Sequence, residues 1–585
     1  MKTLTITILP LVSILTGFLN GDIATSSTIP KQTNPTLYDQ SDKVVQLDVS
    51  SFNDTIYCAS RPNCTAYLVE FYANWCGICR AYRDKYKEFA KDVDNWESVI
   101  QIAAINCGDD INHDLCQAHH ITSYPYIKYF KRNSKNVYDS FKVKAYHTVG
   151  GMRDLITNHL LAEQKLKKYP DWPNFDHIGI IQTYSELWTG VSKSITKLAV
   201  IFESEPNFLA PQLMLDMHHY KNEIAVKRCG RNHSLAAGLN IDDFPSIAIF
   251  ERGQRVPVFI SELRRLLFSE VESYFGNKDP SRNPLTTEVK SNRTVVNCIV
   301  DPELCKKKYF VSESDMLKAI RYALYREVTR NGEDLKGNNL TALFNFVNLL
   351  SDYFPVTTIN ETISTNEITL ESASKAQQVF EKLKQYLIGK MIANHLKADD
   401  WTKEVNRLEK LYDYPFPVNA SWQQCNGSSG QFRGYTCGLW TAFHALTVSA
   451  YKNAPSGNYF DPMTVLYSIK GWVSEFFGCM HCREHFVKMT SQTYKMEDHV
   501  KNRDDVYLYL WRAHNIVNKR LKGDNTEDPE FLKYQFPAPF LCPDCNKSNG
   551  TLDNEQTHKF IIDYYSAIKP YHSQQLENND IAKKA

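Results

Sequence analysis

A mostly apolar run leads directly into a pair of closely spaced cysteines. Residues 66–73 read A-Y-L-V-E-F-Y-A, which is typical of a buried β-strand. Residues 74–80 read N-W-C-G-I-C-R and open a helical pattern. At a helix N-terminus, unpaired N–H groups and the helix dipole stabilise a Cys76 thiolate, and the thiolate is the nucleophile of disulfide exchange. The stretch therefore predicts a redox-active disulfide between Cys76 and Cys79.

A proline farther along the chain supports this interpretation. Residues 121–125, I-T-S-Y-P, precede a second apolar run at residues 126–130. This pattern resembles the thioredoxin fold, in which that proline has a cis peptide bond beside the active disulfide. Secretory relatives commonly carry Gly-His between the cysteines, whereas Gly77 and Ile78 offer neither a proton nor a positive charge. We expect a redox-active thioredoxin domain over residues 38–167.

The N-terminus and the sequons indicate the secretory pathway. Met1-Lys2 and a mostly apolar run to Leu19 predict a signal peptide over residues 1–24. No later stretch has the roughly 20 apolar residues that a membrane-spanning helix needs. We therefore expect a secreted, extracellular glycoprotein that passes through or acts in the Golgi. The candidate glycosylation sites are Asn53, Asn63, Asn232, Asn292, Asn339, Asn360, Asn419, Asn426, Asn546 and Asn549.

Length, charge and cysteine content bound the remaining possibilities. The 585 residues suggest roughly three to five domains, and a net charge of +1 does not favour nucleic acid as a partner. Fifteen cysteines in an oxidising compartment should mostly form disulfides. Proximity in the sequence predicts three structural pairs: Cys58–Cys64, Cys107–Cys116 and Cys298–Cys305.

The second segment, residues 169–277, repeats part of the first. Its strand at residues 197–203 and a proline that precedes a strand at residues 246–250 predict a thioredoxin-like domain without a C-x-x-C, suited to spacing and docking. The P-D-W-P sequence of residues 170–173 reads as a linker. Cys229 has no evident partner; it is either an inert buried thiol or an intermolecular or interdomain link.

The third segment, residues 280–399, shows helical patterns and no chemical motif. Apolar stripes at residues 316–324, 340–350 and 379–391 predict helices whose apolar faces are core or partner-facing surfaces.

The fourth segment, residues 401–569, contains a second C-x-x-C. Residues 476–486 read F-F-G-C-M-H-C-R-E-H-F, so Cys482 and His485 would share one helix face. A C-x-x-C can be a redox disulfide or half of a zinc site.

Three helical stripes in this segment mix cysteine, tryptophan, histidine and asparagine. They suggest a flat aromatic ligand whose faces stack on rings and whose edges and phosphates meet imidazole and amide groups. The stripes are Cys437, Trp440 and His444; Cys482 and His485; and Trp511, His514, Asn515 and Asn518.

The motifs R-G-x-x-C-G-L-W-x-x-F-H, F-x-x-C-x-x-C-x-x-H-F and W-x-x-H-N-x-V-N resemble the flavin domain of Erv-type sulfhydryl oxidases. Joined to thioredoxin-like domains behind a signal peptide, they resemble the quiescin sulfhydryl oxidases. The resemblance implies a multidomain chain: two thioredoxin-like α/β domains, an all-α helix-rich region and an Erv-type FAD-binding helical bundle. Residues 570–585 read as a polar tail. It also implies the further disulfides Cys425–Cys437 and Cys542–Cys545.

The resemblance implies FAD as the cofactor. Relatives often have a tryptophan where this chain has Phe536, which keeps a ring face but lacks an N–H group. His481 lies between the two cysteines of the redox pair. The implied FAD-binding residues are Arg433, Trp440, His444, His481, His485, Trp511, His514, Asn515, Val517, Asn518, Lys533 and Phe536.

The implied activity is a flavin-linked thiol oxidase. Electrons would pass from substrate thiols through Cys76–Cys79 and Cys479–Cys482 to FAD and then to molecular oxygen, giving hydrogen peroxide. The partners would be reduced secretory or extracellular proteins. The third segment would fill the place of a second flavin-domain subunit, which implies a monomer. Because the first and fourth segments must meet and separate, we expect a flexible connection near residues 169–173.

Two alternatives remain. The first is a protein disulfide isomerase or chaperone, which would bind no flavin and need no oxygen. The second is a structural zinc module with Cys479, Cys482, Cys542 and Cys545 as ligands, which an oxidising compartment disfavours.

Overall fold

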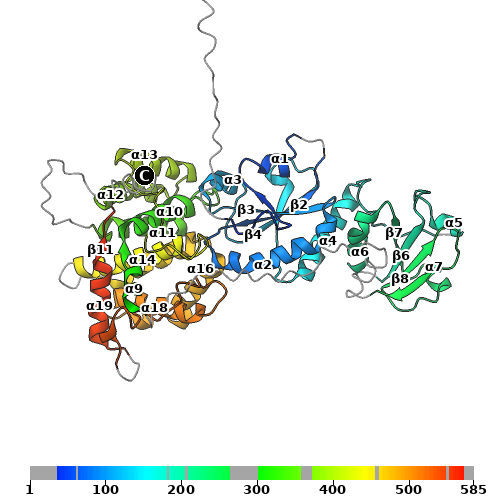
Figure 1. Cartoon of the computed structure of the whole chain (residues 1–585). Coiled ribbons are helices and arrows are strands. Elements are labelled where there is room, and N and C mark those ends of the chain that lie inside the picture. The colour runs from blue at the N-terminus through cyan, green and yellow to red at the C-terminus, as the bar shows by residue number, and fades with distance from the viewer. Residues whose placement is uncertain are drawn as a thin grey trace, which may run out of the picture.

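The structure, a computed structural model, describes most of the chain and is shown in Figure 1. The described residues are 36–60, 63–180, 183–204, 208–263, 301–356, 372–454, 460–547 and 552–571. The predictions that lie outside them are the signal peptide, the pairing of Cys298, the tail beyond residue 571 and the sequons Asn292, Asn360 and Asn549.

The first domain is built on a five-stranded sheet with the order β1-β3-β2-β4-β5. Strands β1, β3 and β2 are parallel, and β4 and β5 are antiparallel to their neighbours. All seven residues of β2 are buried, as the apolar run predicts, and a cis Tyr124–Pro125 bond leads into β4. The elements are β1 (Val45–Leu47), α1 (Phe52–Ile56), β2 (Ala66–Tyr72), α2 (Gly77–Asp92), β3 (Ile100–Asn106), α3 (His113–Ala118), β4 (Tyr126–Phe130), β5 (Ser140–Val143) and α4 (Val149–Leu166).

A second sheet has the order β7-β6-β8-β9, which repeats the pattern β3-β2-β4-β5 of the first. A cis Phe244–Pro245 bond precedes β8, as its counterpart precedes β4. Cys229 lies in β7 with no exposed surface, and burial raises the pKa of its thiol to about 12. This burial favours the inert thiol over a link to another chain. The elements are α5 (Tyr184–Leu187), β6 (Lys197–Glu203), α6 (Leu209–Asp216), β7 (Ile224–Gly230), α7 (Ser234–Gly238), β8 (Ser246–Glu251) and β9 (Phe259–Glu262).

The junction between the two sheets is packed, contrary to the expected flexible connection near residues 169–173. Tyr169 and Trp172 are buried, with ring centroids 4.7 Å apart. The Arg132 guanidinium lies 4.6 Å from the Tyr169 ring and also pairs with Asp171 at 2.6 Å. The aromatic rings of this segment are therefore packed against each other and against Arg132, and they are not exposed as in a flexible linker. The two sheets therefore form one unit, and any hinge toward the helical body must lie elsewhere.

The described residues from 301 onward are mainly helical, and the third and fourth segments form one body. Helices α10 and α11 pack against α14 and α15, and the short strands β10 and β11 pair in parallel. The predicted apolar stripes form the core of this body. The elements are α9 (Pro302–Lys308), β10 (Val311–Ser312), α10 (Glu313–Tyr322), α11 (Asn338–Tyr353), α12 (Ser372–Ala393), α13 (Ala398–Leu411), α14 (Gly434–Asn453), α15 (Pro462–Phe476), α16 (Met480–Lys488), α17 (Met496–His499), α18 (Asp505–Leu521), α19 (Asn554–Ser566) and β11 (Ile568–Lys569).

Short helical turns connect these elements. Figure 1 shows the first sheet between the helical body and the second sheet, with α2 next to α16. The turns are η1 (Asp94–Trp96), η2 (Asp110–Asn112), η3 (Val137–Asp139), η4 (Met217–Tyr220) and η9 (Pro543–Cys545), and the π-helical turns are η7 (Ala323–Glu327) and η8 (Met489–Thr493).

Candidate active site

The first cysteine pair lies at the start of α2, where the sequence predicts it. Cys76 is the N-cap residue of α2 and Cys79 lies in its first turn; both thiols are free and buried. The Cys76 Sγ lies 3.9 Å from the Tyr124 carbonyl oxygen. Burial, followed by the neighbouring Cys76 and Glu70, raises the pKa of the Cys79 thiol. Cys79 therefore needs a proton acceptor before it can act as a nucleophile.

Glu70 is a functional candidate that the sequence reasoning missed. It is fully buried in β2, and its carboxylate accepts a hydrogen bond from the Tyr38 hydroxyl. Burial raises the pKa of Glu70 to about 8, so this carboxyl group can exchange a proton near neutral pH. A single acid inside an otherwise apolar strand was the signal that could have identified it.

The second cysteine pair opens α16. Cys479 is the N-cap residue and forms a disulfide with Cys482 in the first turn. Cys479 has no exposed surface, whereas Cys482 faces a cavity in the helical body. His481 and His485 lie beside this pair, with ring centroids 4.1 Å apart.

The two cysteine pairs meet in one closed interface. The Tyr124 N–H donates to the Gly478 carbonyl at 2.8 Å, and the Met480 N–H donates to the Tyr124 carbonyl at 3.4 Å. Tyr124 and Cys479 thus pair like residues of adjacent parallel strands. Since Cys76 and Cys479 are both fully buried here, no external protein can reach either sulfur in this arrangement.

Other side chains of the first domain secure this contact. The Trp75 ring stacks on Phe477 at 5.6 Å, and its Nε1–H donates to the Tyr322 hydroxyl at 2.9 Å. The Arg80 guanidinium donates to the carbonyls of Gln431 and Thr526 at 2.9 and 3.1 Å. The start of α2 therefore contacts the helical body on both sides of the cysteines.

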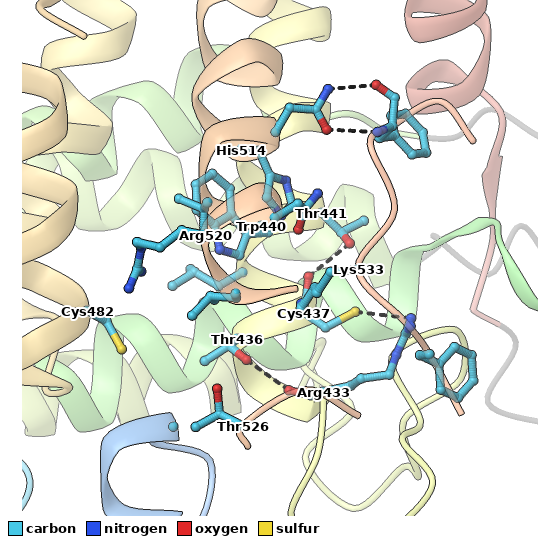
Figure 2. A pocket seen from close by; sticks show the side chains of 18 of the residues that line it. Arg433, Thr436, Cys437, Trp440, Thr441, Cys482, His514, Arg520, Thr526 and Lys533 are labelled. Carbon is cyan, nitrogen blue, oxygen red and sulfur yellow. Dashed lines mark hydrogen bonds between the residues drawn. The ribbon is translucent and has the colours of Figure 1, made fainter. Parts of the chain in front are cut away.

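A cavity of about 580 Å³ lies behind the second disulfide, and Figure 2 shows part of its lining. This volume is in the range of sites for small ligands and cofactors. Cys482 lines the cavity, together with every residue that the resemblance implied for FAD: Arg433, Trp440, His444, His481, His485, Trp511, His514, Asn515, Val517, Asn518, Lys533 and Phe536.

Flat rings form one wall of the cavity. Trp440 and His514 stack with centroids 4.0 Å apart and planes 12° apart. His444 and His514 share a hydrogen bond of 2.9 Å between Nε2 and Nδ1. Burial lowers the pKa of His444 to about 3 and that of His514 well below its ordinary value, so both rings are neutral. These faces suit a flat aromatic ligand.

Two half-buried cations, Arg433 and Lys533, line the same cavity. Burial, followed by the nearby Arg433, lowers the pKa of Lys533 to about 8, and burial also lowers the pKa of Arg433. Neither side chain forms an ion pair within the described ranges. Two neighbouring cations at a cavity wall, neither in a direct ion pair, favour an anionic ligand group such as a diphosphate.

Two of the predicted ligand residues also fix the cavity wall. The Asn515 side chain donates to the Phe536 carbonyl and accepts from the Phe536 N–H, both at 2.8 Å. The Trp511 Nε1–H donates to the same carbonyl. Helix α18 thus holds the segment that carries Phe536 against the cavity.

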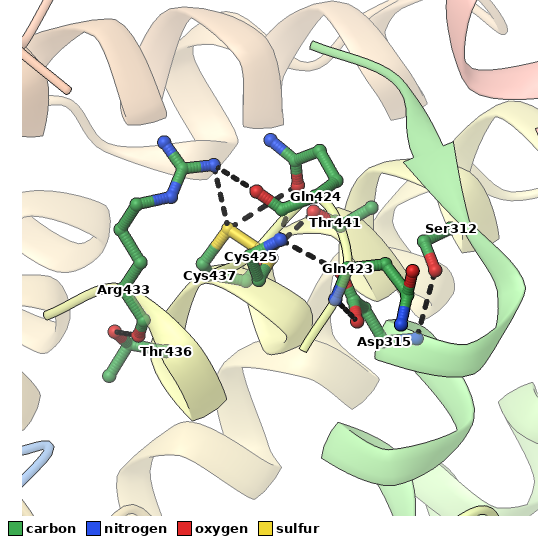
Figure 3. The surroundings of a disulfide bond; sticks show 9 residues. All are labelled: Ser312, Asp315, Gln423, Gln424, Cys425, Arg433, Thr436, Cys437 and Thr441. Carbon is green, nitrogen blue, oxygen red and sulfur yellow. Dashed lines mark hydrogen bonds between the residues drawn. A yellow bond between two sulfur atoms is a disulfide. The ribbon is translucent and has the colours of Figure 1, made fainter. Parts of the chain in front are cut away.

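The disulfide Cys425–Cys437, shown with its surroundings in Figure 3, also borders the cavity, because Cys437 is part of the cavity lining. Asp315 of α10 accepts hydrogen bonds from the N–H groups of Gln423 and Cys425, each at 2.8 Å. A side chain of the third segment therefore anchors the loop that leads to Arg433. No sequence pattern indicates this contact, because its two ends are more than 100 residues apart.

Apart from the free Cys229, and from Cys298, which lies outside the described residues, the remaining cysteines are paired as expected. Besides Cys479–Cys482 and Cys425–Cys437, the disulfides are Cys58–Cys64, Cys107–Cys116 and Cys542–Cys545. The four proposed zinc ligands thus form two disulfides, which leaves no thiolates for a zinc ion. Among the described helices, none is long and apolar enough to cross a membrane.

Comparison with known proteins agrees with this geometry. The model of the thioredoxin family matches residues 43–148, and the model of the Erv1/Alr family matches residues 437–537. Sulfhydryl oxidase 1 of Gallus gallus is 30% identical over 92% of this chain and 69% of its own length. Sulfhydryl oxidase 2 of Mus musculus is 29% identical over 90% of this chain and 73% of its own length.

A solved structure, the sulfhydryl oxidase fragment of human QSOX1, is 29% identical and covers 45% of this chain and 98% of the fragment, with a TM-score of 0.38. The sequence matches, which span about nine-tenths of this chain, confirm the predicted family, and together with the two family matches they confirm the predicted fold class. The chain belongs to the sulfhydryl oxidase family and is a thiol oxidase.

Proposed function

We propose that this protein binds FAD in the cavity beside Cys482 and introduces disulfides into reduced proteins of the secretory pathway. The observation that carries the proposal is the pairing of Tyr124 with Cys479, which brings both C-x-x-C pairs together next to the cavity. An isomerase without flavin would have no use for this contact.

The relay begins with the oxidised Cys76–Cys79 disulfide in an open arrangement. A substrate thiolate attacks Cys76, the Cys76–Cys79 bond breaks, and Cys79 leaves as a thiolate. A second substrate thiolate then attacks the first substrate sulfur and releases Cys76. The substrate gains one disulfide, and Cys76 and Cys79 gain two electrons. The burial of Cys76 in the closed arrangement is why this step requires opening.

The second exchange takes place in the closed arrangement. The Cys76 thiolate attacks Cys479, the Cys479–Cys482 bond breaks, and Cys482 leaves as a thiolate facing the cavity. Cys79 gives its proton to Glu70 and attacks Cys76, which releases Cys479. The first pair is then a disulfide again, and the second pair holds the two electrons.

The cavity residues fit FAD in shape and charge. The Trp440 and His514 faces would bind flat rings, and Arg433 and Lys533 would bind the diphosphate. When bound, FAD supplies chemistry that thiols lack, the two-electron reduction of oxygen to hydrogen peroxide. The protein's part is to hold Cys482 beside it and to exclude water.

We further propose that the protein acts as a secreted monomer with the predicted division at residues 38–167, 169–277, 280–399 and 401–569. Packing of the third segment on the fourth supports the monomer, because α10 and α11 cover faces of α14 and α15. Exposed positions of the sequons Asn53, Asn63, Asn232, Asn419 and Asn426 support glycosylation there, whereas Asn339 and Asn546 are half-buried.

An absorption spectrum of the purified protein tests this proposal. We expect a flavin band near about 450 nm that reduced protein bleaches without air, and that air restores with release of peroxide. A colourless folded protein, or a flavin that thiols do not reduce, would support the isomerase instead.

A further inference from the structure

We propose that Arg330, in the helix-rich region, is a positioning residue for thiol–disulfide exchange between the two cysteine pairs. The inference rests on the proposed relay and adds a residue that belongs to neither redox domain. Its basis is that one guanidinium binds both loops that carry the reacting cysteines.

The contacts of Arg330 span the closed interface. Its Nη2–H donates to the Thr122 carbonyl at 3.0 Å, three residues before the cis proline of the first domain. Its Nη1–H donates to the Phe476 carbonyl, three residues before Cys479. The guanidinium carbon also lies 5.9 Å from the centre of the Tyr124 ring. A single side chain therefore sets the spacing between the two redox loops.

Glu327 extends this connection toward the sulfur atoms. Its buried carboxylate forms an ion pair with Arg330 and accepts a hydrogen bond from the Gly478 N–H. The Gly478 carbonyl in turn accepts the hydrogen bond from Tyr124. Glu327 and Arg330 thus hold the residue before Cys479 in the position where it pairs with the first domain.

Burial makes these contacts sensitive to docking. The Arg330 side chain is only 8% exposed and that of Glu327 only 1%, so in the closed state their polar atoms depend on protein partners and not on water. Separation of the first domain removes the Thr122 carbonyl from Arg330. The guanidinium therefore favours the closed arrangement, in which Cys76 can attack Cys479.

The test replaces the pair without leaving a buried charge. In the variant Glu327→Gln/Arg330→Met, the glutamine keeps an acceptor for the Gly478 N–H, and no uncompensated charge remains. The matched control is Arg407→Met in α13, an arginine that is 59% exposed and pairs with Glu404 within its own helix. Both variants are prepared as flavin-loaded full-length protein.

Flavin reduction is followed by stopped flow without oxygen. Reduced, unfolded ribonuclease A is the probe for the route through Cys76. Dithiothreitol, in a Cys76→Ser/Cys79→Ser background, is the probe for direct reduction of Cys479–Cys482. We expect the double variant to be at least about tenfold slower by the first route and within about twofold by the second, with Arg407→Met unchanged in both.

Equal slowing of both routes would overturn the proposal, because Arg330 would then only support the fold of the flavin module. An unchanged rate by the first route would overturn it as well. If the double variant does not retain flavin, the same two measurements are made on Arg330→Lys. Lysine keeps the charge but cannot bind both carbonyls in the same geometry. The proposal then requires that Arg330→Lys slows flavin reduction by ribonuclease and not flavin reduction by dithiothreitol. Absence of flavin reduction by ribonuclease in the unaltered protein would overturn the relay itself, and this inference with it.

Discussion

Replacement of Gly478 by alanine should weaken the closed arrangement. A Cβ atom at this position would lie 2.9 Å from Oε2 of Glu327, 2.9 Å from Cε2 of Tyr124 and 3.0 Å from Nη1 of Arg330. Such distances are shorter than carbon normally tolerates, so a neighbour must move. Glu327 and Arg330 are buried within the helical body, whereas Tyr124 can move away when the first domain separates.

The expected size of the effect follows from the cost of overpacking. An extra methyl group in a well-packed core costs about 1–3 kcal/mol. If separation of the domains relieves this cost, the equilibrium constant for docking falls roughly 5- to 150-fold. Turnover with protein thiols should fall by a similar factor once exchange between the cysteine pairs limits the rate.

The assay is oxygen consumption with reduced ribonuclease A, and Gly471→Ala in α15 is the control. A Cβ at Gly471 would lie 3.6 Å from the nearest atom, the Cβ of Ala342, which is an ordinary contact. Unchanged turnover of Gly478→Ala with protein thiols would refute the reasoning, because the closed contact would then be unnecessary. Loss of flavin from the variant would assign the damage to the cavity instead of to docking.

Three further predictions concern single side chains. Since the pKa of Glu70 is about 8, the rate of thiol–disulfide exchange by Cys76 and Cys79 should rise between about pH 7 and 9 as Glu70 loses its proton. Glu70→Gln should flatten that rise in stopped-flow measurements. The pKa of Glu70 is higher in the folded than in the unfolded state, so its contribution to stability is present below pH about 4.5 and is lost as the pH rises through about 8. The melting temperature of the unaltered protein should therefore fall more over this pH range than that of Glu70→Gln. An equal fall in the two proteins would contradict this. Lys533→Met should weaken FAD binding about tenfold in fluorescence titrations, and unchanged affinity would remove Lys533 from the diphosphate site. Cys229→Ala should leave turnover and oligomeric state unchanged in size-exclusion chromatography, because a buried thiol cannot link two chains; disappearance of a disulfide-linked dimer would contradict this.

Much of the site could be predicted from local sequence patterns. The first cysteine pair follows a buried strand, and the three mixed stripes recur at helical spacing, so the helix face that each stripe residue occupies could be predicted from the sequence. The other predicted FAD-binding residues, such as Arg433, Lys533 and Phe536, came only from the family resemblance. The structure lines one cavity with all of them. Local spacing carries this information because a helix brings residues three and four positions apart to the same face.

The contacts between segments could not be predicted in this way. Asp315, Glu327 and Arg330 lie in a region whose apolar stripes indicate only core packing, yet they bind the loops around the cavity and the cysteines. Their partners are more than 100 residues away in the sequence, and no periodicity connects them. The flexible connection expected at residues 169–173 was wrong for a related reason, since the proline-rich sequence does not reveal the arginine that stacks on its rings.

The most direct measurement is disulfide mapping of a Cys79→Ser/Cys482→Ser variant. These substitutions leave one thiol in each pair, and oxidised glutathione is added as the oxidant. It forms a mixed disulfide with Cys76 or Cys479 and releases one glutathione thiolate; the other cysteine then displaces the second glutathione thiolate, which leaves a bond between Cys76 and Cys479. We predict that mass spectrometry of the non-reduced monomer, prepared at high dilution, finds the peptides of Cys76 and Cys479 joined within one chain. If both cysteines instead remain free thiols, or pair only with other molecules, the two pairs do not exchange electrons directly and the relay is wrong.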